Sequence, residues 1–240
     1  MHRIAVLAAG LLAAIAATGC AVAVDPGVAP GGPPEAPQGS TSTYFIVTRP
    51  DVRRCAFPLC GGVFVTRVNL VSTVCADGTR QADCHAAAID LTALRLSEEQ
   101  QAEFAGAFEQ KRALVRGRLI QVNQGLAFPV DTLVVTEGWR GVTESVPSGR
   151  FSRLTDSGIR CVTHPCPSFL EAMLNSKATQ SIAEVDLAAS DATPDEIELG
   201  FREFNENGIL AAGSTKIVSG PAGTAAGFRA SEFYVRVRPE

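Results

Sequence analysis

The chain has 240 residues, of which 46% are hydrophobic and 19% are charged, and its formal net charge at pH 7 is −4. No stretch gathers lysine and arginine into a stripe, which argues against nucleic acid as a partner. The acidic surplus is explained by a solvated surface, and the length allows either one large folded domain or two of about 100 residues each.

The N-terminal residues indicate export. Arg3 supplies a short positive region, and residues 4–17 form an apolar run that is too short to span a bilayer comfortably as a helix. The sequence ATGC at 17–20 then resembles a bacterial lipobox, in which small residues precede a cysteine that is lipidated and becomes the new N-terminus. We therefore expect residues 1–20 to be a lipoprotein signal peptide and Cys20 to carry the lipid, palmitate included, that anchors the protein to a membrane.

The residues around this cysteine refine the expectation. Ala17 stands where a lipobox usually has Leu, so an ordinary signal peptide cut near Ala17 or Ala23 is the alternative. Ala21 replaces the Asp that retains a lipoprotein at the inner membrane, which favours the outer membrane, facing the periplasm or the cell surface. Residues 21–43 are rich in Pro, Gly, Ala and Ser, so we expect a disordered tether that holds the folded part off the membrane.

The seven cysteines fit an exported protein with disulfides. With Cys20 set aside for the lipid, an even number remains, and the rest form three close sequential pairs. Other connectivities are open in principle, but the spacing favours the pairs Cys55–Cys60, Cys75–Cys84 and Cys161–Cys166.

The two halves of the remaining chain share an order of features that indicates a diverged duplication. The loops RCAFPLC (54–60) and RCVTHPC (160–166) match, and the same Asn follows each loop at the same spacing. Asp90 and Asp186 match at a smaller separation, because the first half carries an insertion between the two cysteines of its own extra pair. We therefore predict two tandem repeats, residues 44–143 and residues 144–240.

Each predicted repeat has the element order β-β-β-α-β-β. Three strands come first, at 44–49, 63–69 and 85–91 in one repeat and at 150–154, 169–175 and 181–187 in the other. Capping boxes at Ser97 and Thr193 then predict helix starts, each followed by an apolar stripe. Two further strands close each repeat, at 113–122 and 131–139 or at 209–218 and 231–237. This pattern predicts an α+β fold in which each repeat is a mostly antiparallel sheet with one covering helix, and it leaves strand exchange between the repeats open.

The Cys loops admit three interpretations. Redox chemistry is disfavoured, because redox pairs are typically Cys-x-x-Cys at a helix start, whereas strands flank these loops. A staple that closes a turn is the simplest role, and on the chain-entropy model such a short ring contributes about 2 kcal/mol. The loops are also candidate binding tips, with Phe57, Leu59 and His164 as the binding residues, and two similar tips on one tether would raise avidity.

Other chemistries have weaker signals. A protease inhibitor can present a loop pinned by a disulfide, although these loops are short for an extended segment that fills a protease cleft. Cys161, His164 and Cys166 would suit zinc, but the first loop does not repeat this set and oxidised cysteines cannot ligate as thiolates, so we expect no metal and no cofactor. No Gly-x-Ser-x-Gly elbow accompanies His85 or His164, so a noncatalytic protein is expected and a hydrolase is the alternative.

Equivalent arginines precede the first cysteine of each loop. They favour structural ion pairs with the matched carboxylates of the same half, Arg54 with Asp90 and Arg160 with Asp186. Trp139, the single tryptophan, lies at the end of the predicted strand 131–139 and is either a plug between the halves or a platform for a ligand.

The R-C-x4-C-G-G loop before VFVTRVN, the segment ADGTRQADC and the following AIDL together resemble an uncharacterised domain family found in bacterial lipoproteins. The resemblance is best over residues 44–143, whereas Gly61-Gly62 becomes Pro167-Ser168 in the second half. It implies a fold and a compartment and brings no activity. We expect a lipid-anchored envelope protein that binds an unknown envelope protein or ligand or has a structural role.

Overall fold

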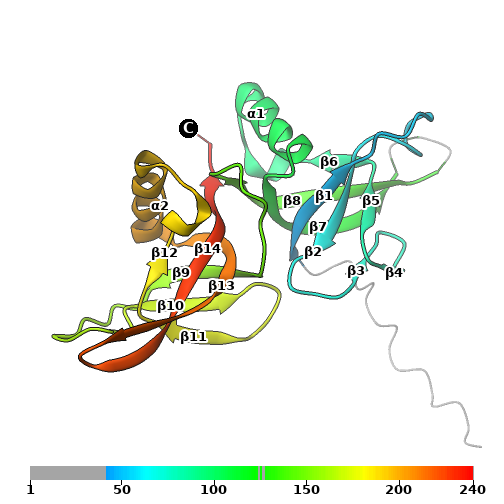
Figure 1. The fold of residues 1–240 in the computed structure, drawn as a ribbon. Helices are drawn as coiled ribbons and strands as arrows, with labels where there is room; N and C mark the ends of the chain where they lie inside the picture. The colour runs from blue at the N-terminus through cyan, green and yellow to red at the C-terminus, as the bar shows by residue number, and fades with distance from the viewer. Residues whose placement is uncertain (1–41, 124, 126–127, 240) are drawn as a thin grey trace, which may run out of the picture. The chain divides into compact units, whose positions relative to one another are not determined.

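The computed structural model describes residues 42–123, 125 and 128–239. The predicted signal peptide, the predicted lipidation site Cys20 and the predicted tether as far as residue 41 lie outside these residues. The described residues form a 12-stranded sheet, a separate two-stranded sheet and two α-helices (Figure 1). They all belong to one compact unit, Ala36–Glu240.

The strands fall into two groups along the chain. The first group is β1 (Thr43–Pro50), β2 (Val63–Arg67), β3 (Thr73–Val74), β4 (Arg80–Gln81), β5 (Cys84–Ala86), β6 (Ala88–Asp90), β7 (Ala113–Val122) and β8 (Val130–Gly141). The second group is β9 (Arg150–Asp156), β10 (Phe169–Met173), β11 (Thr179–Ile182), β12 (Val185–Asp186), β13 (Ile209–Gly220) and β14 (Gly223–Val237). The 3-10 turns η2 (Thr92–Leu94) and η3 (Ala188–Ser190) lead into the helices α1 (Glu98–Glu109) and α2 (Pro194–Asn207).

Both helices begin at a capping box, which confirms the two predicted starts. The side chain of Ser97 accepts a hydrogen bond from the backbone N of Gln100, and the side chain of Thr193 accepts one from the backbone N of Glu196. Pro194 occupies the first turn of α2, where its missing N–H costs nothing. Within the described part of the chain, neither helix is long and apolar enough to cross a lipid bilayer.

The strand order of the large sheet is β11-β10-β9-β13-β14-β8-β7-β1-β2-β5. These neighbours are antiparallel, whereas β6 pairs in parallel with β8 and β12 pairs in parallel with β14. The sheet passes from one group to the other through β14, which pairs first with β13 and then, from Tyr234 to Val237, with β8. The end of β14 therefore joins the two groups.

The predicted α+β fold with two separate sheets, each covered by one helix, is wrong. The fold is mostly β, and a single sheet runs through both groups because β14 extends beyond β13 and reaches β8. Alternating apolar residues predict a strand but do not identify its neighbour. The strands predicted at 85–91 and 181–187 are each divided, into β5 and β6 and into β11 and β12, because the two parts pair with different strands.

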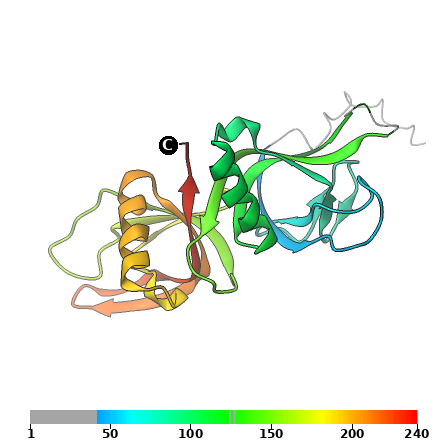
Figure 2. The same cartoon turned by 90° about the horizontal axis from the view of Figure 1, so that it is seen from above.

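Two of the three apolar clusters include helix residues. Phe104 and Phe108 of α1 pack with residues of β1, β2, β5, β7 and β8. Phe204 of α2 packs with Phe228 and Phe233 of β14. Figures 1 and 2 show α1 and α2 lying against the sheet, each beside its own group of strands.

The third cluster joins the strand groups directly. Trp139 of β8 and Tyr234 of β14 are both buried there, together with residues of β7, β13 and the turns that follow β2 and β10. Because successive strand residues point to opposite faces, Tyr234 lies on the face opposite Phe233 and therefore away from α2. Trp139 thus acts as a plug between the groups and does not offer an exposed platform to a ligand.

Two asparagines reinforce this junction with matching hydrogen bonds. Asn69 donates to the carbonyl oxygen of Phe151 at 2.7 Å and accepts from its backbone N at 2.8 Å. Asn175 donates to the carbonyl oxygen of Tyr44 at 2.8 Å and accepts from its backbone N at 2.8 Å. Both have positive φ angles, 61° and 55°, a conformation that asparagine tolerates better than most residues. Each group therefore supplies the side chain that completes the backbone bonds of the other.

Candidate functional site

The first Cys loop, residues 51–62, connects β1 to β2 and is closed by a disulfide and by an ion pair at its base. The disulfide Cys55–Cys60 joins Cα atoms 5.4 Å apart. The carboxylate of Asp51, whose side chain is 1% exposed, accepts hydrogen bonds from Nε and Nη2 of Arg53, each at 2.8 Å. The Arg53 guanidinium holds the pKa of Asp51 well below its usual range, so the base of the loop is a bidentate ion pair.

The tip of this loop presents apolar side chains to solvent. Phe57 is 55% exposed and Leu59 is 63% exposed, whereas Pro58 between them is buried. The backbone N of Leu59 donates to the carbonyl oxygen of Ala56 at 3.0 Å, and Nη2 of Arg53 donates to the carbonyl oxygen of Leu59 at 3.0 Å. The backbone that carries the two predicted tip residues is therefore held in place on both sides.

The second Cys loop, residues 157–168, connects β9 to β10 and is closed in a similar way. The disulfide Cys161–Cys166 joins Cα atoms 5.6 Å apart. Asp156 accepts a hydrogen bond from Nη1 of Arg160 at 3.0 Å, and the Arg160 guanidinium lowers the pKa of Asp156 to about 2. This carboxylate is partly exposed, unlike Asp51 of the first loop.

The tip of the second loop is also exposed around a buried proline. Ile159, Val162 and His164 are exposed, whereas Pro165 is buried. The carbonyl oxygen of His164 accepts a hydrogen bond from the backbone N of Ala222 at 2.9 Å, in the turn between β13 and β14. The predicted tip residue His164 therefore lies at the surface, and its backbone is fixed against a neighbouring turn.

The predicted ion pair between Arg160 and Asp186 is wrong. Arg160 pairs with Asp156 at the base of its own loop. Asp186 lies on β12 and accepts a hydrogen bond from Nζ of Lys216 at 3.1 Å. Arg160 and Asp186 are therefore both ion-paired, but each with a partner other than the one predicted.

The predicted ion pair between Arg54 and Asp90 is wrong as well. Arg54 is exposed and makes no ion pair within the described residues, because the neighbouring Arg53 pairs with Asp51. Asp90 accepts a hydrogen bond from the backbone N of Thr92 at 2.9 Å and so begins the turn η2. The ion pair at the base of the first loop is instead made by Arg53 with Asp51, neither of which was predicted to pair.

The third disulfide, Cys75–Cys84, joins Cα atoms 5.3 Å apart and is buried in the cluster under α1. It closes the segment that contains the turn after β3 and the strand β4, and it links the end of β3 to the start of β5. The three predicted disulfides are therefore confirmed.

The two histidines of the described chain lie at different loops. Nε2 of His85 lies 2.7 Å from the carbonyl oxygen of Gly61 and 3.2 Å from Oδ2 of Asp51, so this ring supports the first loop. His164 lies in the second loop, and β1 and β9, which lead into the loops, are separated by other strands in the sheet. Among the described residues, no three His, Cys, Asp or Glu side chains form a group that could hold a metal ion.

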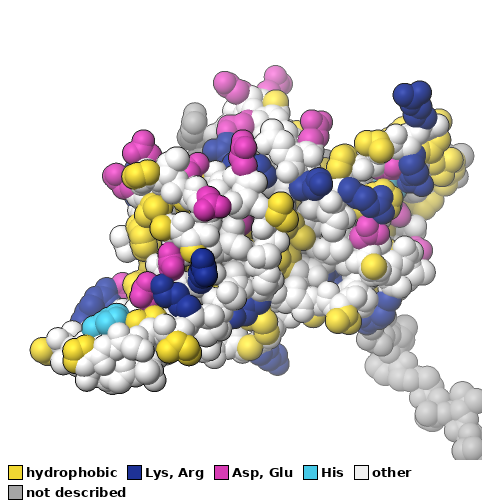
Figure 3. All heavy atoms as spheres, viewed as in Figure 1, with side chains coloured by type: hydrophobic (Ala, Val, Ile, Leu, Met, Phe, Trp, Pro, Cys, Tyr) yellow, Lys and Arg dark blue, Asp and Glu magenta, His cyan; other side chains and the backbone are white. Residues whose placement is uncertain are grey.

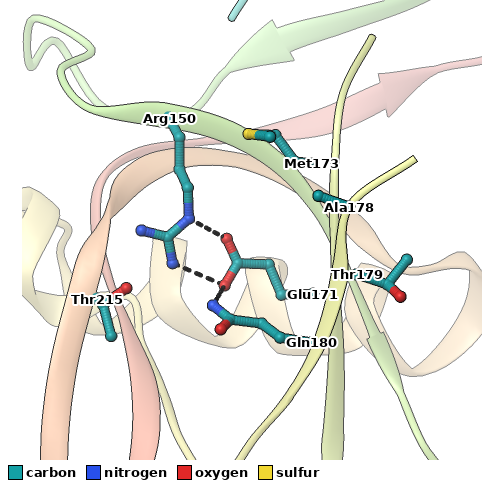
Figure 4. A pocket seen from close by; sticks show the side chains of 7 residues that line it. All are labelled: Arg150, Glu171, Met173, Ala178, Thr179, Gln180 and Thr215. Atoms are coloured by element: carbon teal, nitrogen blue, oxygen red, sulfur yellow. Dashed lines mark hydrogen bonds and ion pairs between the residues drawn. The ribbon is translucent and has the colours of Figure 1, made fainter. Parts of the chain in front are cut away.

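Sequence reasoning missed a buried carboxylate on β10, which is shown in Figure 4. Glu171 is ion-paired with Arg150 of β9, whose Nη2 lies 2.7 Å from its carboxylate, and it also accepts hydrogen bonds from Ser152 at 2.7 Å and Gln180 at 2.6 Å. Burial alone would raise the pKa of Glu171, but these hydrogen bonds outweigh it and lower the pKa below its ordinary value. A signal was present, because Glu171 occupies an inward position of an alternating strand.

The Glu171 cluster borders a cavity of about 320 Å³, whose lining includes Met173 and Thr215 (Figure 4). The carboxylate already accepts hydrogen bonds from three side chains, which leaves it little capacity for a ligand. The cluster is therefore best explained as a polar connection among β9, β10 and β11.

A second buried carboxylate lies where the chain passes from β8 towards β9. Glu232 of β14 accepts hydrogen bonds from the backbone N of Thr143 at 3.1 Å and of Phe233 at 2.8 Å. Burial raises the pKa of Glu232 to about 7. Glu232 therefore fastens the start of the β8–β9 connection, residues 142–149, to β14.

On the face drawn in Figure 3, acidic side chains gather over the region of the two helices and basic side chains are scattered. The first turns of α1 and α2 carry Glu98 and Glu99, and Asp195 and Glu196, where the helix dipole favours negative charge. This face shows no basic stripe.

The fold and loops define a mostly β domain stabilised by three disulfides. The chain belongs to the family described as a domain of unknown function (DUF6748), whose sequence model matches residues 44–240. The match covers both strand groups, so membership extends beyond residues 44–143, where the resemblance was expected to be best. Comparisons with curated proteins and with solved structures gave no match.

Proposed function

We propose that the protein is a noncatalytic, lipid-anchored protein of the bacterial cell envelope that binds another envelope protein through the tips of its Cys loops. Phe57 and Leu59 form the first tip, and Val162 and His164 form the second. The observation that carries this proposal is that firmly held loop backbones keep apolar side chains in solvent.

Exposure alone would be a weak argument, because single apolar residues are common on protein surfaces. In both loops, however, a disulfide, an Arg–Asp ion pair and a buried proline hold the backbone beside the exposed residues. A loop that is already ordered loses little conformational entropy when it binds, so more of the contact energy appears as affinity. A staple that served stability alone would not require apolar residues at its tip.

The shape of the first loop favours a protein surface over a protease cleft. The hydrogen bond between Leu59 and Ala56 makes the tip a tight turn, whereas a substrate-like inhibitor presents an extended segment. The disulfides fit an oxidising compartment such as the periplasm. We place the anchor at Cys20, which follows small residues in the lipobox-like sequence.

Replacement of Cys20 tests the anchor. The Cys20→Ser variant is expected to move from the membrane fraction to the soluble periplasmic fraction, and the N-terminal peptide of the unaltered protein is expected to carry acyl chains in mass spectrometry. An unacylated N-terminus at Ala21 or later, with equal fractionation of the two proteins, would contradict the lipid anchor.

Photocrosslinking in cells tests the binding surface. A photoreactive residue at Phe57 or Val162 is expected to give discrete crosslinked products of one size. The same residue at Val71, which is fully exposed outside the Cys loops, is the matched control and is expected to give none of these products. Equal products at Val71, or none at either tip, would contradict the proposal.

A further inference from the structure

A groove of about 770 Å³ lies away from the tips of both Cys loops. Three segments and one further side chain line it: residues 46–48 of β1, residues 110–112 between α1 and β7, residues 144–147 of the β8–β9 connection, and Phe151 of β9. The groove therefore lies where the two strand groups meet, beside the junction that Asn69 and Asn175 complete.

Most of the groove wall is apolar. The apolar lining residues are Ile46, Val47, Val146, Pro147 and Phe151. The volume lies within the range of small-molecule sites, about 300–1,000 Å³. A stable protein partner would instead cover about 800 Å² of surface on each side, which a groove of this size does not offer.

The charged lining residues are Lys111, Arg112 and Glu144, so the groove has one more positive than negative side chain. The two cations are adjacent in the chain. Nη2 of Arg112 donates to the carbonyl oxygens of Gly141 at 2.7 Å and Val142 at 3.0 Å. Nε of the same guanidinium is buried and has no hydrogen-bond partner among the described residues. The two carbonyl acceptors hold the Arg112 guanidinium beside the groove, where its positive charge adds to that of Lys111.

We propose that the groove binds one fatty-acid-type molecule, an unbranched apolar chain that ends in a carboxylate. The apolar walls take the chain, and the carboxylate is attracted by Lys111 and Arg112, the two cations that line the groove. A carboxylate suits this pair because charge-assisted hydrogen bonds from Arg and Lys are stronger than those to a neutral acceptor. The charge of Arg112 also acts on Glu232, but the Glu232 carboxylate accepts its hydrogen bonds from the backbone N of Thr143 and Phe233 and not from the guanidinium.

Calorimetric titration with decanoate and decanol tests the proposal without any change in the groove. The full chain with Cys20→Ser is used, so that no attached lipid interferes, and decanoate is kept below its micelle concentration. Decanoate is expected to bind saturably at one molecule per chain and at least about tenfold more tightly than decanol. Unsaturable binding, no binding, or equal affinity for the two molecules would overturn it.

Three single variants test where the carboxylate binds. Lys111→Gln is expected to weaken decanoate binding about tenfold, and Glu144→Gln is expected to strengthen it by removing repulsion. Lys177→Gln, at an exposed lysine that does not line the groove, is the matched control and is expected to leave the affinity unchanged. Equal effects of Lys111→Gln and Lys177→Gln would overturn the proposal, whatever the outcome for the loop tips.

Discussion

Val65 of β2 and Glu171 of β10 follow the second cysteine of their loops at the same spacing, yet their chemistry is opposite. Val65 is fully buried in an apolar cluster, whereas Glu171 is a buried carboxylate paired with Arg150. The first group adds the buried disulfide Cys75–Cys84, and the second group adds the hydrogen bonds of Ser152 and Gln180 to the carboxylate. The comparison teaches that one strand position can be filled by a polar group when its hydrogen bonds are satisfied.

The two loops differ in their supports and agree at their tips. The side chain of Asp51 is buried beside His85, whereas the side chain of Asp156 is partly exposed. The second loop is held to the β13–β14 turn by the backbone hydrogen bond from Ala222 to His164. In both loops the proline is buried and apolar neighbours are exposed. The two loops thus keep an exposed tip although the burial of their ion pairs differs, and we assign function to this tip.

The largest expected effect is the loss of the buried carboxylate. Glu171→Ala is expected to lower the free energy of unfolding by about 4 kcal/mol at pH 7, because Arg150 loses its partner. Because the pKa of Glu171 is lowered in the folded state, its stabilisation is present above the unfolded pKa and is lost as the pH falls through the folded pKa. The deficit of Glu171→Ala in urea denaturation should therefore shrink in acid.

Val65→Ala is the matched control in the other group. It removes buried methyl groups and is expected to cost about 2 kcal/mol with little dependence on pH. If Glu171→Ala cost less than Val65→Ala at pH 7, the polar cluster would not have the stabilising role described here.

Removal of one disulfide at a time should lower the free energy of unfolding by different amounts in the two strand groups. Replacing Cys75 and Cys84 together by Ala is expected to lower the free energy of unfolding by about 3 kcal/mol, because the ring is longer and its sulfur atoms are buried in a core. The Cys161–Cys166 disulfide closes a shorter ring in an exposed loop, so the same change there is expected to cost about 2 kcal/mol. Denaturation midpoints in the reverse order would contradict the comparison.

Glu232 should show the opposite pH dependence to Glu171. Burial raises its pKa to about 7, so its charge destabilises the fold as the pH rises from the unfolded pKa towards 7 and beyond. Glu232→Gln retains an acceptor for Thr143 and is expected to raise the free energy of unfolding by about 3 kcal/mol at pH 8 and to have little effect at pH 4. Calorimetric melting of both proteins across this range measures the difference, and a variant that is less stable at pH 8 would contradict it.

Much of the local structure could be predicted from the sequence because its signals are local. The disulfides follow from close cysteine spacing, and the helix starts follow from capping boxes at Ser97 and Thr193. Strand partners were not predictable, since the pairing of β14 with β8 depends on residues far apart in the chain. The predicted ion pairs failed because each loop uses a carboxylate at its own base, Asp51 or Asp156, and not the matched Asp90 or Asp186.

The role of the candidate binding tips stays a prediction. Phe57, Leu59 and His164 lie at the surface as their role requires, but surface position does not test binding. The buried Glu171 and Glu232 could have been suspected, since each carboxylate interrupts the apolar alternation of a strand. The partners of Glu171 come from β9 and β11, and Thr143 reaches Glu232 from the β8–β9 connection, so no local pattern identifies these partners.

The most direct test of the central claim is photocrosslinking at Phe57 with and without the Cys55–Cys60 disulfide, which is replaced by a pair of serines. If the disulfide holds a binding tip ready, the crosslinked product should be lost while the circular dichroism spectrum of the purified variant stays unchanged. A product of undiminished yield in the folded serine variant would contradict this claim, because the tip would then bind without the disulfide, and the disulfide would be a staple alone.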